Sequence, residues 1–354
     1  MSFGFRFMPV GCRLRGDHVS EATVSLGYAK ALVTLAISKG ALPQRFAEIA
    51  GCDLLQAENP DLRVPFAIFQ ALMREAKQAC GDPAFGLHFG AESQFVDMSI
   101  VGLITHAAET MGQAFEQMNR FARLAIEVDS HDSGDRFAIT RRDGEVWIED
   151  RRLDPNDFPE LTEATFARFI SNTARFMGDV PFAKHIVVTH TEPVHLSAYA
   201  EILKVPVTFV SDRNAIAIHE SWLSLPLPYS NHYVFGVFSD KAQALLEELL
   251  LAKTVKGQVE SALIRTLHTG EFGMDQIARK LGQSRTSLYR KLKAEGVTFD
   301  GLVDTLRHRM AIGYLAGRKL SVSEAAYLLG FADPSAFSRA FKRWTGKSPR
   351  EHLK

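Results

Sequence analysis

Cysteine is scarce in this chain of 354 residues. The three cysteines lie far apart and form no C-x-x-C pair: Cys12, Cys52 and Cys80. This spacing excludes a disulfide-rich secreted scaffold and fits idle thiols in a reducing cytoplasm. An apolar run of about 18 residues, the length of a membrane-spanning helix, is also missing, and the first twenty residues lack the apolar core of a signal peptide. We therefore expect a cytoplasmic protein without a membrane partner.

The signatures of common enzyme classes are absent as well. No H-E-x-x-H, G-x-S-x-G, P-loop or G-x-G-x-x-G sequence occurs, and the acidic residues form no pair that suggests acid–base catalysis. Three histidines recur at intervals of five residues: His185, His190 and His195. On a strand this interval places neighbours on opposite faces, and Pro193 would break a helix that aligned them. We therefore predict no catalytic residue, no metal site and no cofactor.

The last hundred residues contain the same unit twice. Residues 274–282 reappear as residues 322–330, a pair of leucines at 288 and 292 reappears as phenylalanines at 337 and 341, and Gly296 reappears as Gly346. Each copy has the length and glycine placement of two helices joined by a tight turn. The repeat therefore predicts two helix-turn-helix units, at about 273–296 and 321–346.

The helix ends of the second unit have strong local signals. Ser321 and Glu324 have the spacing of a capping box, in which each side chain accepts from the other residue's backbone amide. Gly330 suits the tight turn, and Asp333 followed by Pro334 opens the next helix as N-cap and first residue. The first unit has a glycine, Gly273, at the place of Ser321. We therefore expect weaker capping in the first copy.

The second helix of each unit has an apolar face and an opposite polar stripe at offsets 0, 3, 4 and 7. In the first unit the stripe contains Thr286, Tyr289, Arg290 and Lys293. In the second unit it contains Ser335, Ser338, Arg339 and Lys342. Hydrogen-bonding groups and cations of this kind contact base edges and phosphates in a major groove. With the neighbouring Arg285 and Arg343, the two stripes form the candidate DNA-contact set.

The stretch from about 270 to 354 resembles the DNA-binding domain of AraC/XylS-type transcription regulators. The matching residues are Leu281-Gly282-Gln-Ser284, Leu288-Tyr-Arg290-Lys-Leu292, Arg307, and the closing run from Ser335 to Pro349. The resemblance implies an all-α domain whose two helix-turn-helix units are joined by a linker helix, here at about 299–316. It also implies binding to promoter DNA, activation in most members, and RNA polymerase as a partner. By position, the base-facing candidates are Thr286, Tyr289, Arg290, Ser335 and Arg339.

Charge is divided unevenly along a chain that is neutral as a whole. Residues 258–354 contain 17 Lys and Arg against 9 Asp and Glu, whereas residues 1–257 contain 24 against 32. A basic domain beside an acidic one fits a module that binds a polyanion, joined to a partner domain that does not.

The N-terminal part alternates helical and strand-like segments. Helices are expected at about 22–39, 43–50, 65–80, 98–108, 111–126, 160–177, 197–204 and 239–253. Strands are expected at about 136–140, 145–149, 185–189, 206–210 and 215–219. This alternation predicts an α+β domain. The expected division is a sensing and dimerisation domain at 1–235, a linker helix region at 236–256, and the DNA-binding domain at 257–354.

This part also resembles the arabinose-binding-like sensor domain of one branch of the same family. The resemblance is carried by Gly86-Leu-His-Phe-Gly90, Val188-Thr-His190-Thr-Glu-Pro193, Pro206-Val207-Thr-Phe209 and Asn214-Ala-Ile-Ala-Ile218. It implies a small-molecule effector and a homodimer, and it does not identify the ligand.

The sequence alone assigns no effector-binding residue. Phenylalanines in the helical part could line an apolar cavity, although most should be core: Phe66, Phe69, Phe85, Phe89, Phe95, Phe115 and Phe121. Arginines could pair with a carboxylate, although solvated positions are expected for them: Arg120, Arg123, Arg141, Arg142, Arg151 and Arg152. A carboxylate or an apolar metabolite are both open as effectors. Two alternatives remain: an N-terminal domain that only dimerises, and an enzyme fused to a DNA-binding domain.

Overall fold

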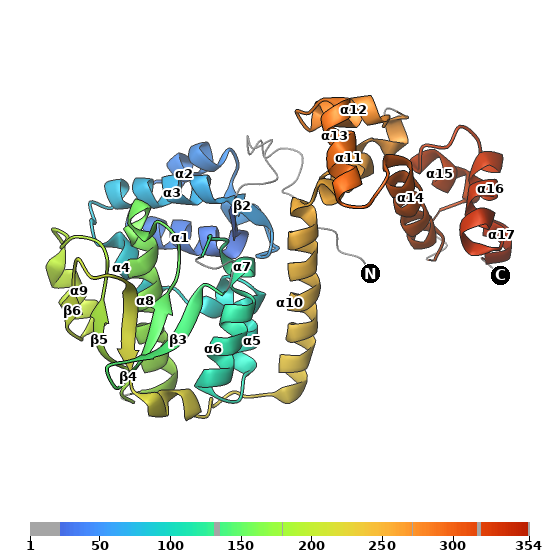
Figure 1. Cartoon of the computed structure of the whole chain (residues 1–354). Helices are drawn as coiled ribbons and strands as arrows, with labels where there is room; N and C mark the ends of the chain where they lie inside the picture. The colour runs from blue at the N-terminus through green and yellow to red at the C-terminus, as the bar shows by residue number, and fades with distance from the viewer. Residues whose placement is uncertain (1–21, 131–134, 179, 271, 317–319, 353–354) are drawn as a thin grey trace. The chain divides into compact units, whose positions relative to one another are not determined.

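The computed structural model describes residues 22–130, 135–178, 180–270, 272–316 and 320–352. These residues divide into two compact units (Figure 1), one that extends to Glu248 and one that begins at Leu249. The division falls inside helix α10 (His232–Lys253). One continuous helix therefore connects the two units along the chain.

A five-stranded sheet forms the centre of the N-terminal unit, with the strand order β3-β4-β7-β5-β6. The strands are β3 (Phe137–Arg142), β4 (Glu145–Asp150), β5 (Ala183–Val187), β6 (Val207–Thr208) and β7 (Asn214–Ile218). Neighbours are antiparallel except β5 and β6, which lie parallel and are connected through helix α9 (Leu196–Leu203). A parallel pair needs such a crossover. The five expected strands are present, and the α+β class is confirmed.

Further helices of the unit precede and follow the strands in the chain. They are α1 (Leu26–Ser38), α2 (Pro43–Ala50), α3 (Phe66–Ala79), α4 (Phe85–Glu92), α5 (Ile100–Ala107), α6 (Met111–Arg120), α7 (Ala122–Ala125) and α8 (Pro159–Met177). Short 3₁₀ turns occur at Leu54–Gln56, Phe95–Asp97, Pro155–Asp157 and Glu220–Ser224. The expected helix at 111–126 is divided into α6 and α7, because the backbone leaves the helical region at Phe121.

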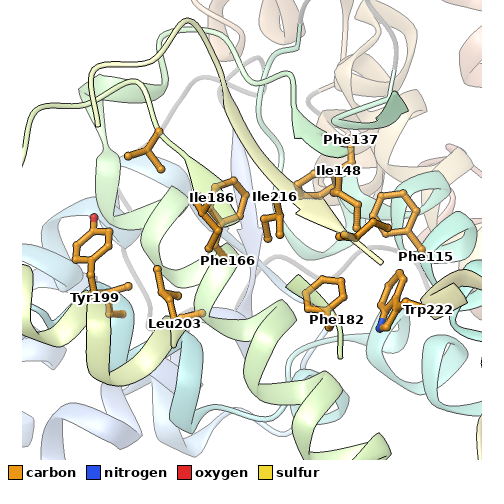
Figure 2. Packing of buried hydrophobic residues seen from close by; sticks show 14 of the residues in the cluster. Phe115, Phe137, Ile148, Phe166, Phe182, Ile186, Tyr199, Leu203, Ile216 and Trp222 are labelled. Carbon is orange, nitrogen blue, oxygen red and sulfur yellow. The ribbon is translucent and has the colours of Figure 1, made fainter. Parts of the chain in front are cut away.

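The core of the unit lies between one face of the sheet and helices α8 and α9 (Figure 2). Alternate strand residues such as Ile148, Ile186 and Ile216 point to this face, as the period of a strand requires, and they meet Phe166 of α8. The opposite face carries a smaller cluster around Trp147. The sheet thus has one deeply buried face, which positions α8 and the side chains along it.

The start expected for the first helix of this unit is wrong. The helix expected from residue 22 begins at Leu26, because Thr23–Ser25 forms strand β1, which pairs with β2 (Arg63–Pro65). Ser25 then caps the helix, and its hydroxyl accepts from the amide of Tyr28 at 3.2 Å. Such a short strand has no periodic signal, since its partner lies forty residues away in the sequence.

Helix α4 was not expected, because two glycines at 86 and 90 disfavour a helix. The structure shows why they are needed. A Cβ at Gly90 would lie 2.3 Å from the carbonyl oxygen of Ala164, so α4 packs backbone to backbone on α8. Close packing of two helices therefore overrides local propensity here.

Helix α10 begins seven residues earlier than the expected residue 239. Asn231 accepts from the amide of Val234 at 3.0 Å and holds the first turn. The aromatic, β-branched and glycine residues of 232–238 have low helix propensity, which hid this turn from the sequence. Among the described cysteines, Cys80 is a free thiol, whereas Cys52 is disulfide-bonded, which contradicts the expectation of a thiol there. Cys12 lies outside the described residues.

The C-terminal unit is helical. Its helices are α11 (Val255–Thr266), α12 (Met274–Lys280), α13 (Arg285–Ala294), α14 (Phe299–Ala316), α15 (Val322–Leu328), α16 (Pro334–Thr345) and α17 (Pro349–His352), with a 3₁₀ turn at Leu267–Thr269. Helices α12 and α13 form the first helix-turn-helix, and α15 and α16 form the second. Both expected units and the expected linker helix at 299–316 are therefore present.

Each helix-turn-helix has its own hydrophobic core, and α14 contributes to both. Leu302 and Leu306 pack with Leu288 and Leu292 in the first core. Further along the same helix, Leu315 belongs to the second core. Because α14 is one continuous helix, it sets the spacing between the two helix-turn-helix units.

The two turn glycines, Gly282 and Gly330, offer a matched test of this packing. Both have positive φ, at 64° and 68°. A Cβ at Gly330 would lie 2.2 Å from the carbonyl oxygen of Leu267, whereas a Cβ at Gly282 would have no atom within 4 Å. We expect Gly282→Ala to cost about 1–2 kcal/mol through the left-handed backbone alone. Gly330→Ala should cost clearly more, as urea unfolding would measure, and equal losses would contradict the close approach.

Candidate nucleic-acid interface and ligand cavity

Local capping sets the start of each helix in the two helix-turn-helix units. Ser321 Oγ accepts from the Glu324 amide at 3.2 Å, and Glu324 accepts from the Ser321 amide at 2.7 Å, which confirms the expected capping box. Asp333 accepts from the Ala336 amide at 2.8 Å. At Gly273 only half of a box exists, in which the Gln276 side chain accepts from the glycine amide at 2.5 Å. The first copy is therefore the more weakly capped.

The polar stripe of α13 lies on the solvent side of the first unit. Thr286, Tyr289, Arg290 and Lys293 are exposed, and Leu288 and Leu292 are buried on the opposite face. Arg290 has no ion-pair partner among the described residues, while the neighbouring Arg285 forms an ion pair with Asp275 at 2.8 Å. Arg290 is thus available to an external acceptor, and Arg285 already has one.

The stripe of α16 repeats this arrangement with one difference. Ser335, Arg339 and Lys342 are exposed. Ser338 is half-buried, and its hydroxyl donates to the carbonyl oxygen of Pro334 at 2.8 Å. Arg343 forms an ion pair with Asp304 of α14 at 2.8 Å. Arg339 occupies the position in α16 that Arg290 occupies in α13. It forms no ion pair with a described residue.

Arg307 of α14 contacts residues of the second helix-turn-helix and the residue before the first one. Its guanidinium donates to the carbonyl oxygens of Leu329 and Gly330 at 2.9 and 2.8 Å. The same group stacks on Phe331 and on Phe272, the residue before the first unit, at 4.3 and 4.8 Å from the ring centroids. The turn of the second helix-turn-helix is thereby held by the helix that also supports the first. The two stripes therefore belong to one rigid assembly of helices.

The N-terminal unit contains a cavity of about 130 Å³ between α5, α6 and α8. Its wall is largely aromatic and aliphatic and includes Phe95, Phe115, Phe137 and Trp222. Phe115, Phe137 and Trp222 lie together at one end of the core in Figure 2. A concave, mostly apolar site with a few polar groups is the usual form of a small-molecule site. Of the phenylalanines considered from the sequence, Phe95 and Phe115 line this cavity.

The arginines considered from the sequence do not line the cavity. Arg141 and Arg142 are exposed and pair with Glu220 and Asp212. Arg120 donates to Gln243 of α10 at 3.0 Å. Arg152 is buried and donates to the Phe158 carbonyl and the Thr162 hydroxyl, and Arg123 and Arg151 also lie away from the cavity wall.

Two arginines that sequence reasoning missed lie deep in the wall, Arg136 and Arg168. Arg136 pairs with the buried Asp150 at 2.8 Å. Arg168 lies on the face of α8 that turns toward the cavity, and helical periodicity within 160–177 was the one signal that could have pointed to it.

The evenly spaced histidines join different contacts. His195 Nε2 lies 2.8 Å from Glu163, which also accepts from the Tyr199 hydroxyl at 2.9 Å. His190 Nε2 lies 3.1 Å from the same hydroxyl. Burial and the Glu163 carboxylate raise the pKa of Tyr199, so the hydroxyl stays protonated. His185 instead packs against Trp147. In the described part of the chain, no group of three metal-ligating side chains occurs.

None of the described helices combines the length and the apolar character needed to cross a membrane. The family model described as the arabinose-binding domain of AraC transcription regulators matches residues 40–227. A model described as a helix-turn-helix domain matches residues 277–354.

Similar proteins extend over most of the chain. The ornithine utilization regulator of Pseudomonas aeruginosa is 27% identical over 335 residues, which are 93% of this chain and 96% of that protein. The regulator VqsM of the same organism is 24% identical and covers 75% of this chain and 82% of its own. The crystal structure of the P. aeruginosa regulator CdpR covers 88% of this chain and 96% of its own, with 21% identity and a TM-score of 0.40.

Both sequence relatives are named as regulators, so the alternative of an enzyme fused to a DNA-binding domain is dropped. The helix-turn-helix match makes the C-terminal unit a DNA-binding domain, and the N-terminal match makes the other unit a domain of the ligand-binding type. The chain belongs to the AraC family of transcription regulators, in the branch with an arabinose-binding-type domain ahead of the helix-turn-helix domain.

Proposed function

We propose that the chain is an effector-controlled transcription activator that binds promoter DNA as a homodimer and contacts RNA polymerase. The observation that carries the proposal is the pair of exposed stripes on α13 and α16, one in each copy of the repeat and both supported by α14. The cavity of the other unit supplies a place for the effector. Because such a regulator acts on DNA, we place it in the cytoplasm.

The stripes divide into groups with different roles on DNA. Arg290 and Arg339 read bases, most favourably guanine, since a free guanidinium can donate two parallel hydrogen bonds to that base. Lys293 and Lys342 contact phosphates and fix the register. Thr286, Tyr289, Ser335 and Ser338 add hydrogen bonds or methyl contacts to the same grooves. The two helices enter adjacent major grooves about 34 Å apart, one turn of the duplex.

Arg285 and Arg343 are proposed as conditional contacts. Each forms an ion pair within the free chain, with Asp275 and Asp304 respectively. These pairs are exposed, so each contributes little stability. A phosphate can therefore compete for either guanidinium when DNA binds.

The domain boundaries follow the same division. We assign residues 1–235 to sensing and dimerisation, 236–256 to the connecting helix, and 257–354 to DNA binding. Helix α10, which supplies most of the connection, exposes Tyr233 and Val237 at 81% and 48%. Exposed apolar side chains on one helix support its use in dimerisation. The ornithine relative is a regulator of a catabolic function by its name, which supports control by a metabolite.

A reporter assay tests the proposal. Genomic fragments selected by the purified full-length chain are placed ahead of a reporter gene, and output is measured with and without small-molecule extracts. We expect output to rise with one or more extracts and to vanish in an Arg290→Ala, Arg339→Ala double variant. A chain that selects no preferred fragment would overturn sequence-specific regulation. Output that depends on the chain but ignores every extract would leave the N-terminal unit a dimerisation domain only.

A further inference from the structure

Helix α8 supplies many of the polar side chains that line the cavity in the N-terminal unit. Six of the contributing residues of α8 recur at offsets 0, 3, 4, 7, 8 and 11, which is one helical face: Thr165, Arg168, Phe169, Asn172, Thr173 and Phe176. Arg175 of the same helix also lines the cavity. The remainder of the wall is mostly apolar, with Tyr28, Gln94, Thr105, His106 and Arg136 as its polar members. The space therefore has a largely apolar lining with polar groups along α8.

Arg168 is a buried cation on this wall, with 6% of its surface exposed. Its Nη1 donates to the Tyr28 hydroxyl at 2.7 Å, and its Nη2 makes a longer contact of 3.4 Å with the Ser93 hydroxyl. Its Nε is buried and has no hydrogen-bond partner. A guanidinium has five N–H donors, so these contacts leave part of its donor capacity unused.

No carboxylate forms an ion pair with Arg168 among the described residues. Two other buried arginines of the unit do have one: Arg136 pairs with Asp150 at 2.8 Å, and Arg63 lies 3.8 Å from Glu127. The buried Arg152 donates instead to the Phe158 carbonyl and the Thr162 hydroxyl, away from the cavity. Two rings, those of Tyr28 and Phe89, face the Arg168 guanidinium at 4.9 and 5.2 Å. Rings and neutral hydroxyls offset a buried charge only in part. Among the described residues, Arg168 is therefore a buried cation with unused donors and no anionic partner.

The rest of the wall decides which anion fits. Among the described residues, its titratable members are Tyr28, His106, Arg136, Arg168 and Arg175, and none is an Asp or Glu. A ligand with an ammonium group would therefore find no acidic partner. Apolar cavities of about 150 Å³ accept a benzene-sized body, which is close to the volume found here.

We infer that Arg168 anchors the carboxylate of an apolar monoacid about the size of one ring, whose body fills the space between Phe115, Phe137 and Trp222. The inference rests on the proposed effector control and names its ligand class. Asn172, one turn along α8, is placed to hydrogen-bond the same head group. Aromatic acids and medium-chain aliphatic acids share this chemistry.

The cavity wall is also connected to the helix that leads to the DNA-binding unit. Met111, Ala114 and Leu227 line the cavity and also pack in a cluster with Phe235 of α10. On the same helix as Met111, Arg120 donates to Gln243 of α10. An acid bound in the cavity would therefore contact side chains that also pack against α10. A change in DNA affinity requires that it bind two states of this wall unequally.

Calorimetry with the full-length chain tests the inference. The probes are benzoate, phenylacetate and octanoate, and the affinity of each acid is compared with that of its neutral amide. Ornithine, an acid that also carries two ammonium groups, is the comparison for a cationic ligand. We expect at least one apolar acid to bind about tenfold or more tightly than its amide, since a bidentate guanidinium–carboxylate contact is lost in the amide. Ornithine should bind more weakly than that acid. Comparison of benzoate and phenylacetate with octanoate shows whether the site takes an aromatic or an aliphatic acid.

Variants locate the anchor. Arg168→Gln should lose the preference for the acid over its amide, and Arg168→Lys should retain part of it, because Lys keeps the charge without the planar fork. Arg141→Gln, an exposed arginine paired with Glu220 away from the cavity, is the matched control and should bind as the parent does. Circular dichroism checks that each variant is folded. If Arg168→Gln does not fold, the affinities of the parent chain for each acid and its amide still test whether the site prefers a carboxylate.

Amides that bind as well as their acids, or an Arg168→Gln chain with unchanged acid preference, would overturn the anchor. So would a chain that binds none of the acids. Effector control is judged separately, by the response of the reporter to extracts. A reporter that responds to a neutral or cationic compound would therefore overturn the carboxylate inference and leave the proposed function standing.

Discussion

Replacement of Arg339 by alanine should lower the affinity for a cognate DNA site about 5- to 150-fold, which corresponds to about 1–3 kcal/mol. Arg339 is exposed on α16, and no ion pair with a described residue occupies its guanidinium. Its hydrogen bonds are therefore available to a base edge without first breaking an internal contact. Fluorescence anisotropy on the cognate duplex and on a random duplex of equal length measures the change. The loss should be smaller on random DNA, which offers no matched base.

Lys342→Ala, one turn further along the same helix, is the control. A phosphate contact is independent of sequence, so affinity should fall by similar factors on both duplexes. The plot of log affinity against log salt concentration has a negative slope, and the magnitude of this slope should become smaller by about 1. If Arg339→Ala also weakened both duplexes equally, Arg339 would be a phosphate contact and the proposed base reading would be wrong.

The two copies of the repeat should contribute unequally to site preference. The first has half a capping box at Gly273 and an exposed tyrosine, Tyr289, at a position where its ring can meet a thymine methyl or a phosphate. The second has a full box, an N-cap aspartate and an aromatic core. Its Ser338 is occupied by the Pro334 carbonyl. The first copy is therefore the better candidate for promoter discrimination, and the second for regular anchoring.

Most of the C-terminal unit could be predicted because its signals are local. Caps, turn glycines and apolar faces lie within a few residues of the structure that they specify, as at Ser321 and Gly330. What the sequence could not reveal is the approach of Gly330 to Leu267, which joins the second copy of the repeat to the turn that precedes the first copy.

The N-terminal site was less predictable because its contacts are distant in sequence. Strand β1 exists only because residues near 64 pair with it. Arg168 lies on a correctly expected helix, but nothing in the sequence shows that its neighbours would be Tyr28 and Ser93 and not an acid. The absence of a carboxylate beside a buried arginine is visible only when the packing is known.

Asp150→Asn should destabilise the N-terminal unit by about 3–5 kcal/mol, because it would leave buried guanidinium charge without its counter-ion. The Asp150 carboxylate is 1% exposed and accepts from Arg136 Nε at 3.2 Å and Nη2 at 2.8 Å, and from the Arg152 amide at 3.2 Å. Urea unfolding followed by the fluorescence of Trp147 and Trp222, in a Trp344→Phe background, measures the loss. Glu220→Gln, which breaks an exposed pair with Arg141, should leave the midpoint unchanged.

The loss should depend on pH with a defined sign. Burial acts to raise the pKa of Asp150, but the charges of Arg136 and Arg152 and their hydrogen bonds outweigh it, so the pKa lies below its ordinary value. A carboxylate whose pKa is depressed by folding contributes stability above its unfolded pKa of about 4 and loses it as the pH falls through the folded value. The difference between parent and variant should therefore be full near about pH 7 and shrink toward about pH 3. A difference that stays constant over this range, or a cost no larger than that of Glu220→Gln, would show that the buried pair does not stabilise the N-terminal unit.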